Sequence, residues 1–270
     1  MQTTNIIKEQ IKTYCAKIGI DCCGIAPSPT GSGCAVVCLF PYYQPIKEVR
    51  NLSRYAVMKD YHQVIMQYLT HICEFIQDLT GEDYSSNLFC DNSPYHDRQL
   101  AVSAGLGIIG QNTCLIHPVY GSFVFIGYII CEMLYLPVDT PQTGTCLNCG
   151  RCRQACCGGA LQQDIFRLER CASHISQKKG SLSAGEEKIL KRNPLIWGCD
   201  ICQEVCPYNQ ALPVTPIIEF RQDLRPFLSA KELQPLSRRE FKKRYHDRAF
   251  SWRGRDVLLR NLTLKEKKQI

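Results

Sequence analysis

Eight cysteines near the middle of the chain have the spacing that holds two iron–sulfur clusters. The first run reads Cys146-x2-Cys149-x2-Cys152-x3-Cys156, and the second reads Cys199-x2-Cys202-x3-Cys206-Pro207, with Cys171 between them. In bacterial two-cluster ferredoxins, three cysteines separated by two-residue gaps ligate one cluster and the fourth ligates the other. This crossover predicts a first cluster held by Cys146, Cys149, Cys152 and Cys206. It predicts a second cluster held by Cys156, Cys171, Cys199 and Cys202, and therefore a protein that transfers electrons.

Two other uses of closely spaced cysteines fit the chain less well. Structural zinc also takes four cysteines, but its sites usually present two separate pairs rather than a run of four. A secreted disulfide framework needs a signal peptide, and the polar N-terminus MQTTNIIKEQIKTYCAK lacks the apolar stretch of one. We therefore expect a cytoplasmic protein whose thiols meet a reducing environment and bind metal.

Ten further cysteines show no metal-binding spacing among themselves, and Cys157 is one of them. Cys157 stands where a proline usually follows the fourth cysteine, so it is an alternative ligand, although Cys156 has the expected spacing. We expect most of the others to be small buried apolar residues. They are Cys15, Cys22, Cys23, Cys34, Cys38, Cys73, Cys90, Cys114 and Cys131.

Positive charge is concentrated at the C-terminal end of the chain. The formal net charge is +7, and residues 221–270 carry 15 lysines and arginines against 6 acidic residues. A basic segment on a nearly neutral body indicates a polyanionic partner, although a solvated helix face has the same composition. The longest apolar run, residues 123–136, is interrupted by Gly127 and Glu132 and is too short to cross a membrane, so we expect no membrane association.

Hydrophobic periodicity and loop residues divide the chain into three predicted segments of an α+β protein. Residues 1–140 form a mixed α/β domain, residues 141–215 a ferredoxin-like module with two clusters, and residues 216–270 a basic helical tail. In the first segment we expect a first helix capped by Thr3, Thr4 or Asn5, helices over 60–79 and 97–104, and strands over 34–40, 113–116 and 123–136.

The segment after residue 90 carries the most specific resemblance to a known family. It reads Asp91-Asn-Ser-Pro94-Tyr-His-Asp97-Arg98 and continues through Ala104-Gly-Leu-Gly-Ile-Ile-Gly-Gln-Asn112-Thr113 to Ile116-His117-Pro-x-Tyr120-Gly-Ser122. Shorter matches are Tyr42-Tyr43-x-Pro45, Asp60-Tyr61-His62, Arg170-Cys171-x-Ser173, the run from Gly198 to Asn209, and Trp252-Arg253-Gly254-Arg255. On these residues the sequence resembles the epoxyqueuosine reductases, cobalamin-dependent iron–sulfur enzymes of tRNA modification.

The resemblance implies a fold, a reaction and its partners. The N-terminal α/β domain would bind cobalamin, and electrons would pass singly from two [4Fe–4S] clusters to its cobalt. Epoxyqueuosine in a tRNA anticodon would lose its epoxide oxygen and become queuosine, with Asp91 matching the family's general acid. The implied partners are the tRNA anticodon stem–loop and a reduced flavodoxin or ferredoxin as electron donor. The implied cobalamin contacts are Tyr43, His62, Asp91, Thr113, Leu115, His117 and His174.

A general acid must be protonated near neutral pH, so Asp91 needs surroundings that raise the pKa of its carboxyl. Burial against apolar groups has this effect, and Leu88, Phe89 and Cys90 come immediately before Asp91. We therefore expect a buried carboxyl beside the corrin. The alternative is that Asp91 caps the helix predicted over 97–104.

Three departures from the family pattern leave another function open. Asp97 replaces a glutamate, Gln111 replaces a lysine, and the chain ends at Ile270, which implies a short form lacking the family's C-terminal helical repeats. Basic residues of the last segment are candidates for binding RNA phosphates in their place. The alternative function is a corrinoid iron–sulfur reductase that acts on a small electrophilic substrate. A ferredoxin-like electron carrier would not need the 140 residues before the cysteines.

Overall fold

The computed structural model describes residues 2–163 and 165–266. The chain forms two compact units, each assembled from three separate stretches. The first unit comprises Met1–Tyr43, Tyr61–Asn148 and Gln210–Ile218, and the second comprises Gln44–Asp60, Cys149–Asn209 and Glu219–Ile270. This interleaved arrangement contrasts with the three consecutive segments that the sequence predicted.

The first unit is built on an antiparallel sheet of four strands in the order β1-β2-β6-β3. Its strands are β1 (Cys23–Pro27), β2 (Cys34–Pro41), β3 (Leu88–Cys90) and β6 (Val124–Cys131). Every residue of β2 is buried, because β2 lies inside the sheet and is covered on both faces. The alternating side chains of β2 therefore supply two different hydrophobic layers.

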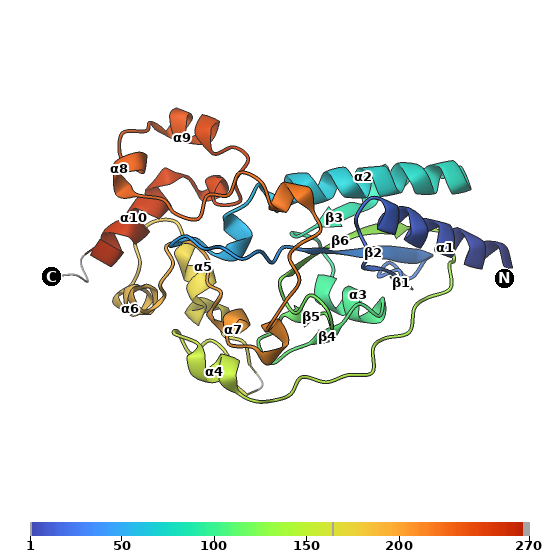
Figure 1. The fold of residues 1–270 in the computed structure, drawn as a ribbon, viewed down its shortest axis with the longest axis horizontal. Coiled ribbons are helices and arrows are strands. Elements are labelled where there is room, and N and C mark those ends of the chain that lie inside the picture. The colour runs from blue at the N-terminus through green and yellow to red at the C-terminus, as the bar shows by residue number, and fades with distance from the viewer. Residues whose placement is uncertain (1, 164, 267–270) are drawn as a thin grey trace. The chain divides into compact units, whose positions relative to one another are not determined.

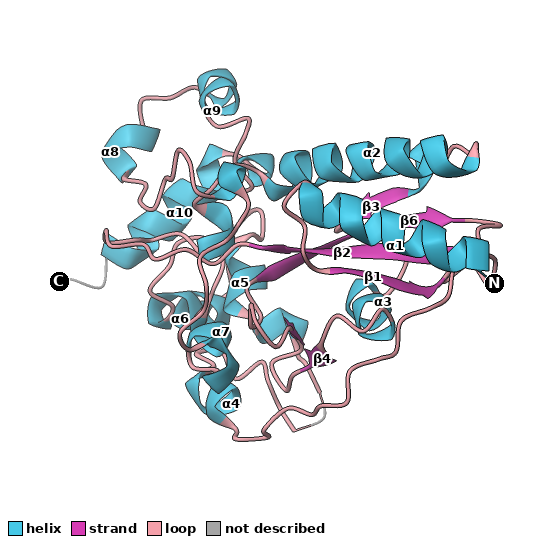
Figure 2. Ribbon diagram, turned by 45° about the vertical axis from the view of Figure 1, so that its right-hand side comes forward, coloured by secondary structure: helices cyan, strands magenta, loops and turns pink. Residues whose placement is uncertain are grey.

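Helices cover both faces of this sheet. Helices α1 (Gln2–Lys17) and α2 (Tyr61–Thr80) pack against each other and against one face (Figure 1). Helix α3 (Asp97–Ser103) packs against the other face (Figure 2). The short hairpin of β4 (Ile108–Ile109) and β5 (Leu115–Ile116) follows α3.

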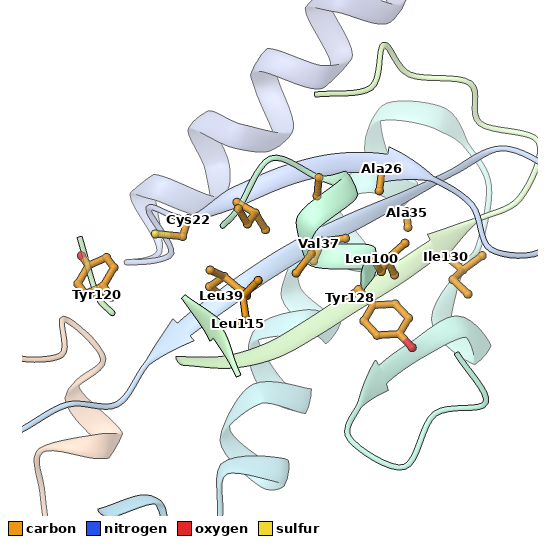
Figure 3. Packing of buried hydrophobic residues seen from close by; sticks show 13 residues of the cluster. Cys22, Ala26, Ala35, Val37, Leu39, Leu100, Leu115, Tyr120, Tyr128 and Ile130 are labelled. Carbon is orange, nitrogen blue, oxygen red and sulfur yellow. The ribbon is translucent and has the colours of Figure 1, made fainter. Parts of the chain in front are cut away.

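The layer under α3 contains every second side chain of β2. Val37 and Leu39 of β2 meet Leu100 of α3 and Tyr128 of β6 there (Figure 3). The intervening β2 residues face α1 and α2 instead. At Gly127, directly opposite Cys38, an added Cβ would lie 2.7 Å from Ile65 of α2, so α2 approaches the sheet closely there.

The helices of the first unit were largely predictable from periodicity. The prediction over 60–79 is confirmed by α2, whose buried residues recur at helical spacing: Val64, Ile65, Leu69, Ile72, Cys73 and Ile76. The predictions over 34–40 and 97–104 are confirmed by β2 and α3. The strand predicted over 123–136 ends earlier, at Cys131, where a turn begins and Met133 adopts a positive φ of 63°.

The second unit consists of short helices that are connected by long loops. They are α4 (Arg151–Ala155), α5 (Ala172–Ser176), α6 (Ala184–Arg192), α7 (Ile201–Glu204), α8 (Ala230–Leu233), α9 (Arg238–Arg244) and α10 (Arg255–Glu266). Capping boxes begin α6 and α9, where Ser183 pairs with Glu186 and Ser237 with Glu240.

Residues 219–266 are integral to this second unit and do not form a separate tail. Trp197, which is fully buried, packs in one core with Phe241, Tyr245, Phe250 and Leu258. Helix α10 contacts both α6 and α8 (Figure 1). The charged residues of this part of the chain lie on helices whose opposite faces are apolar and buried. Within the described ranges 2–163 and 165–266, no helix is both long and apolar enough to cross a membrane.

Candidate active site and cluster-binding cysteines

Asp91 lies in a tight turn directly after β3. Asp91 and Asn92 have positive φ values of 57° and 47°, a conformation that residues other than glycine adopt infrequently. The turn brings the carboxyl to the beginning of α2. There the Tyr61 hydroxyl donates to Asp91 Oδ2 at 2.7 Å, and His62 Nε2 lies 3.5 Å from the same oxygen. The Asn92 N–H donates to the other oxygen, Oδ1, at 2.9 Å.

Aromatic stacking fixes the Tyr61 side chain. Its ring stacks on Phe125 of β6 with centroids 4.1 Å apart and on His62 with centroids 4.0 Å apart. Phe125 in turn stacks on Tyr42 at 4.3 Å. The hydroxyl that faces Asp91 is therefore held by packing against the sheet rather than by the loop alone.

The electrostatic surroundings of Asp91 differ from those expected of a buried acid. Hydrogen bonds with His62, Tyr61 and the Asn92 amide lower the pKa of its carboxyl to about 2, although partial desolvation opposes them. The side chain is 55% exposed. The expectation of a buried carboxyl with a raised pKa is wrong for this structure. The capping alternative is wrong as well, because α3 begins at Asp97 with His96 in the capping position.

The other predicted cobalamin contacts have different surroundings. Tyr43, Thr113, Leu115 and His117 belong to the first unit, as His62 and Asp91 do, whereas His174 belongs to the second. Leu115 is buried in the core under α3, so its side chain is not available to a ligand. His174 is exposed on α5. Among these predicted contacts, His62 is brought into contact with Asp91.

His117 is held by other groups of the protein. Its Nδ1 accepts the N–H groups of Val119 and Tyr120 at 3.2 and 3.3 Å, and its Nε2 lies 3.5 Å from Cys22 Sγ. Burial lowers the pKa of the imidazole. The ring therefore has a clear structural role in closing the turn after β5.

The loop between β4 and β5 has features of a binding loop. Thr113 has a φ of 63°, which is strained for a β-branched residue. Its carbonyl accepts the Arg98 guanidinium. Two buried side-chain atoms of the same loop, Gln111 Oε1 and Asn112 Nδ2, have no hydrogen-bond partner among the described residues. Buried polar groups are normally satisfied, so these two amides fit a ligand with polar groups at its edge, as the amide-bearing corrin ring has.

Seven of the eight predicted cluster cysteines lie in the second unit, and Cys146 lies in the first. Several of them sit beside the first turns of short helices, where backbone N–H groups are unpaired. Cys171 precedes α5 and interacts with the N–H groups of Ser173 and His174, while the Ala160 N–H donates to Cys156 Sγ at 3.2 Å. Such N–H···S bonds stabilise thiolates that ligate a cluster.

Cys157 lies next to a predicted ligand of the second cluster. Its thiol forms a hydrogen bond with Cys199, which lowers the pKa of Cys157 to about 7. Both residues border the small core formed by α5 and α6. The position of Cys157 keeps it as an alternative to Cys156, and the choice between them stays a prediction.

A buried carboxylate anchors the segment that carries Cys199 and Cys202. Asp200 accepts hydrogen bonds from Arg50 at 2.7 Å and from the Arg54 N–H at 2.9 Å, and it also contacts the Ser53 hydroxyl. These donors all come from residues 44–60. Sequence reasoning did not connect this stretch with the cysteines, although Asp200 stands inside the Cys-x2-Cys run.

Sequence reasoning also missed two groups of residues that the structure brings together. The first group is Tyr61 with His62 and Asp91. Tyr61 was part of a match to the family but was not assigned to the site, although it directly precedes His62. The second group is Cys15, Cys23 and Cys38, whose sulfurs converge in the first unit. Their separation in sequence gives no motif, and the face on which Cys38 lies follows only from the pairing of β2 with β1.

Two family models match separate parts of the chain. The model described as epoxyqueuosine reductase QueG, DUF1730, matches residues 30–92, and the model described as a 4Fe-4S double cluster binding domain matches residues 145–209. The first range contains Tyr43, His62 and Asp91. The second contains all eight predicted cluster cysteines, which supports a cluster-binding domain in this chain.

Whole-chain comparisons give the same relatives. An epoxyqueuosine reductase of Lactococcus garvieae is 35% identical over 216 residues, which make up 78% of this chain and 60% of that protein. The chain thus spans about three-fifths of that relative. A solved epoxyqueuosine reductase from Streptococcus thermophilus matches with a TM-score of 0.82 and 26% identity, covering 96% of this chain and 80% of that chain.

A second solved structure is similar over most of this chain. It is the epoxyqueuosine reductase of Bacillus subtilis with its catalytic aspartate loop swung out of the active site, and it matches with a TM-score of 0.83 and 25% identity over 97% of this chain and 81% of that chain. These matches confirm the resemblance to the epoxyqueuosine reductase family and the mixed α/β fold with a cluster-binding domain.

Proposed function

We propose that this chain is a member of the epoxyqueuosine reductase family and that it reduces epoxyqueuosine in tRNA to queuosine. One observation carries the proposal. The part of the chain that matches the family's own model ends in the Asp91 turn with its Tyr61 and His62 partners, and the same chain carries the complete two-cluster cysteine pattern. Removal of an epoxide oxygen as water consumes two electrons and two protons, so the site needs both an electron path and a proton donor.

The eight cysteines supply the electron path. Their thiolates would hold two [4Fe–4S] clusters, which pass electrons one at a time. A reduced flavodoxin or ferredoxin is the natural donor to such clusters. Bound cobalamin would supply the reduced metal centre that acts on the epoxide. The unsatisfied amides of Gln111 and Asn112 and the strained Thr113 are the residues that would contact the corrin edge.

Asp91, positioned by Tyr61 and His62, would deliver one of the two protons, and the other would come from solvent. The uncovered carboxyl is ionised, because its pKa is about 2. Covering it with the apolar face of a corrin and with substrate removes water, and desolvation raises the pKa of a carboxyl. His62 and Tyr61 carry hydrogens that reach the same oxygen, so a proton is within hydrogen-bonding distance when the epoxide opens. In a solved Bacillus subtilis epoxyqueuosine reductase the catalytic aspartate loop is swung out of the active site, and we infer that the Asp91 turn is its counterpart.

A basic cavity in the second unit fits a nucleic-acid backbone. Its volume is about 1010 Å³, and its lining includes Lys179, Arg238, Lys242, Arg253, Arg255 and Arg260. Trp252, which is 60% exposed, lies at the same cavity with the Arg253 guanidinium 3.6 Å from its ring centroid. Cations that neutralise phosphates beside an aromatic ring that can stack on a base are typical of RNA binding. We propose that the anticodon stem–loop contacts this cavity.

A second candidate function is reduction of a small electrophile that is not part of an RNA. The observation that favours it is Gln111, which removes a positive charge expected in this family near the site. The test compares an epoxyqueuosine-containing anticodon stem–loop with the free nucleoside, using anaerobic protein loaded with both clusters and cobalamin. Faster conversion of the stem–loop supports the tRNA substrate. Equal or faster conversion of the nucleoside supports the small-substrate function.

A further inference from the structure

Three cysteines outside the cluster pattern converge in the first unit. Cys15 lies in the last turn of α1, Cys23 begins β1, and Cys38 lies within β2. Cys23 and Cys38 are directly opposite in the antiparallel register, so both side chains project from the same face of the sheet. That face is the one covered by α1, and the three sulfur atoms lie within 4.8 Å of one another.

The three positions differ in exposure. Cys15 and Cys38 are fully buried, whereas Cys23 at the beginning of its strand is only partly buried. The thiols of Cys23 and Cys38 both lie within hydrogen-bonding reach of Cys15.

The spacing of the sulfurs suits one thiophilic metal ion. A metal–sulfur distance of about 2.3 Å places three sulfurs of a trigonal site about 4 Å apart, so the observed group needs to contract by less than about 1 Å. Thiolates are the ligands that select Cu(I) and zinc. Within residues 2–163 and 165–266, no other group of three metal-ligating side chains is this compact.

We propose that Cys15, Cys23 and Cys38 bind a single thiophilic d¹⁰ cation, Cu(I) or Zn²⁺, at a site separate from both iron–sulfur clusters. Cu(I) is satisfied by three sulfurs. Zn²⁺ needs a fourth ligand, which a water molecule can supply from the side of Cys23. An ion here would join the end of α1 to β1 and β2 and so clamp the helix to the sheet.

The alternative is that these cysteines are three small buried residues. A matched control for that case is Cys73, which is also a buried cysteine of the first unit, on α2, but is not part of the group. If burial alone explains the cysteines, Cys15→Ala and Cys73→Ala behave alike toward metal. If the three sulfurs form a site, only the first variant loses it.

The test uses the full chain prepared anaerobically with its iron–sulfur clusters loaded. One equivalent of Cu(I) is offered from a chromophoric chelator, and Zn²⁺ is offered in the same way in a second series. Wild type and Cys73→Ala should each take up one equivalent of one of these ions without losing iron. Cys15→Ala should bind it at least about 100-fold more weakly, since a ligand contributes more than the outer-sphere groups that account for 10- to 100-fold. If Cys15→Ala does not fold, Cys23→Ser replaces it as the variant that lacks one ligand, because Cys23 is only partly buried.

X-ray absorption at the metal edge identifies the ion's ligands. Three sulfur neighbours around copper assign Cu(I), and three sulfurs with one oxygen assign Zn²⁺. The proposal is overturned if wild type takes up neither ion, or if Cys15→Ala and Cys23→Ser retain the wild-type affinity. It is also overturned if the bound ion has ligands other than these sulfurs. None of these results depends on turnover. The metal site can therefore be confirmed even if the proposed function fails, and the function can be confirmed even if the metal site fails.

Discussion

The Tyr61 hydroxyl donates to Asp91 Oδ2 at 2.7 Å and thereby connects the first turn of α2 with the turn after β3. The two residues are 30 positions apart in sequence. Because the Tyr61 ring is stacked on the sheet through Phe125, the hydroxyl is a fixed reference point for a carboxyl that lies in a strained loop. Tyr61 is thus a positioning residue for Asp91.

Removing that hydroxyl should raise the pKa of Asp91. In Tyr61→Phe the carboxylate loses one of its hydrogen bonds, so the pKa moves upward from about 2. A lowered folded pKa stabilises the fold above the unfolded value near 3.9, and that stabilisation is lost as the pH falls toward 2. Urea unfolding between pH 5 and about pH 3 should therefore depend less on pH in the variant.

The expected difference in this unfolding experiment is small. The carboxyl is 55% exposed, so solvent screening keeps it below about 1 kcal/mol. Tyr68→Phe, about two turns further along the same helix, is the control. Identical pH dependence in wild type and Tyr61→Phe would show that the hydrogen bond does not influence the carboxyl.

Asp91→Asn should keep the fold and both cofactor types but lose most turnover. An amide cannot transfer the proton that a carboxyl transfers, and general acid catalysis contributes about 10²- to 10⁴-fold. The measurement is single-turnover conversion, with iron and cobalt quantified on the same sample. Asp78→Asn, an exposed position on α2, should retain full activity. Full activity in Asp91→Asn would remove Asp91 from the chemistry.

Cys199→Ser should lower the iron content of the anaerobically reconstituted protein. The crossover pattern makes each run contribute to both clusters, so losing one ligand is expected to disturb the second cluster and, more weakly, the first. Cys157→Ser is the matched variant, because Cys157 touches Cys199 but has the less favourable spacing. It should retain wild-type iron. If instead Cys157→Ser loses iron and Cys156→Ser does not, Cys157 is the ligand.

Binding of an anticodon stem–loop should depend on the basic cavity of the second unit. Lys242→Ala removes one candidate phosphate contact, which should weaken binding and reduce the slope of log Kd against log salt by about 1. Trp252→Ala should weaken binding with little change in the slope, since stacking does not release counterions. Lys47→Ala, at an exposed position outside the cavity, is the control. Unchanged affinity in both cavity variants would place the RNA elsewhere.

The sequence predicted helices and strands correctly where one hydrophobic pattern extends over a long segment. Helix α2 was predictable because its buried residues recur at helical spacing along 20 residues, and strand β2 was predictable because it is a continuous apolar run of 8 residues. Strand β3 has only 3 residues, too few to show any period. The division into units was not predictable, because residues 44–60 join the second unit through distant partners such as the buried Asp200.

The site was predictable only in part, because some of its residues are brought together by tertiary packing rather than by local sequence. Spacing identified the cluster cysteines, since ligands from one loop must be close in sequence. Burial of Leu115 and exposure of Asp91 depend on tertiary packing, which the local sequence does not contain. Cys15, Cys23 and Cys38 come from a helix and two strands, so no spacing rule could have grouped them.

Mass spectrometry of the RNA product tests the central proposal most directly. Protein loaded with both clusters and cobalamin is mixed anaerobically with a strong reductant and an anticodon stem–loop that carries epoxyqueuosine. We predict that the modified base loses the mass of one oxygen atom and elutes as queuosine. An unchanged stem–loop, with iron and cobalt both verified in the protein, would contradict the account.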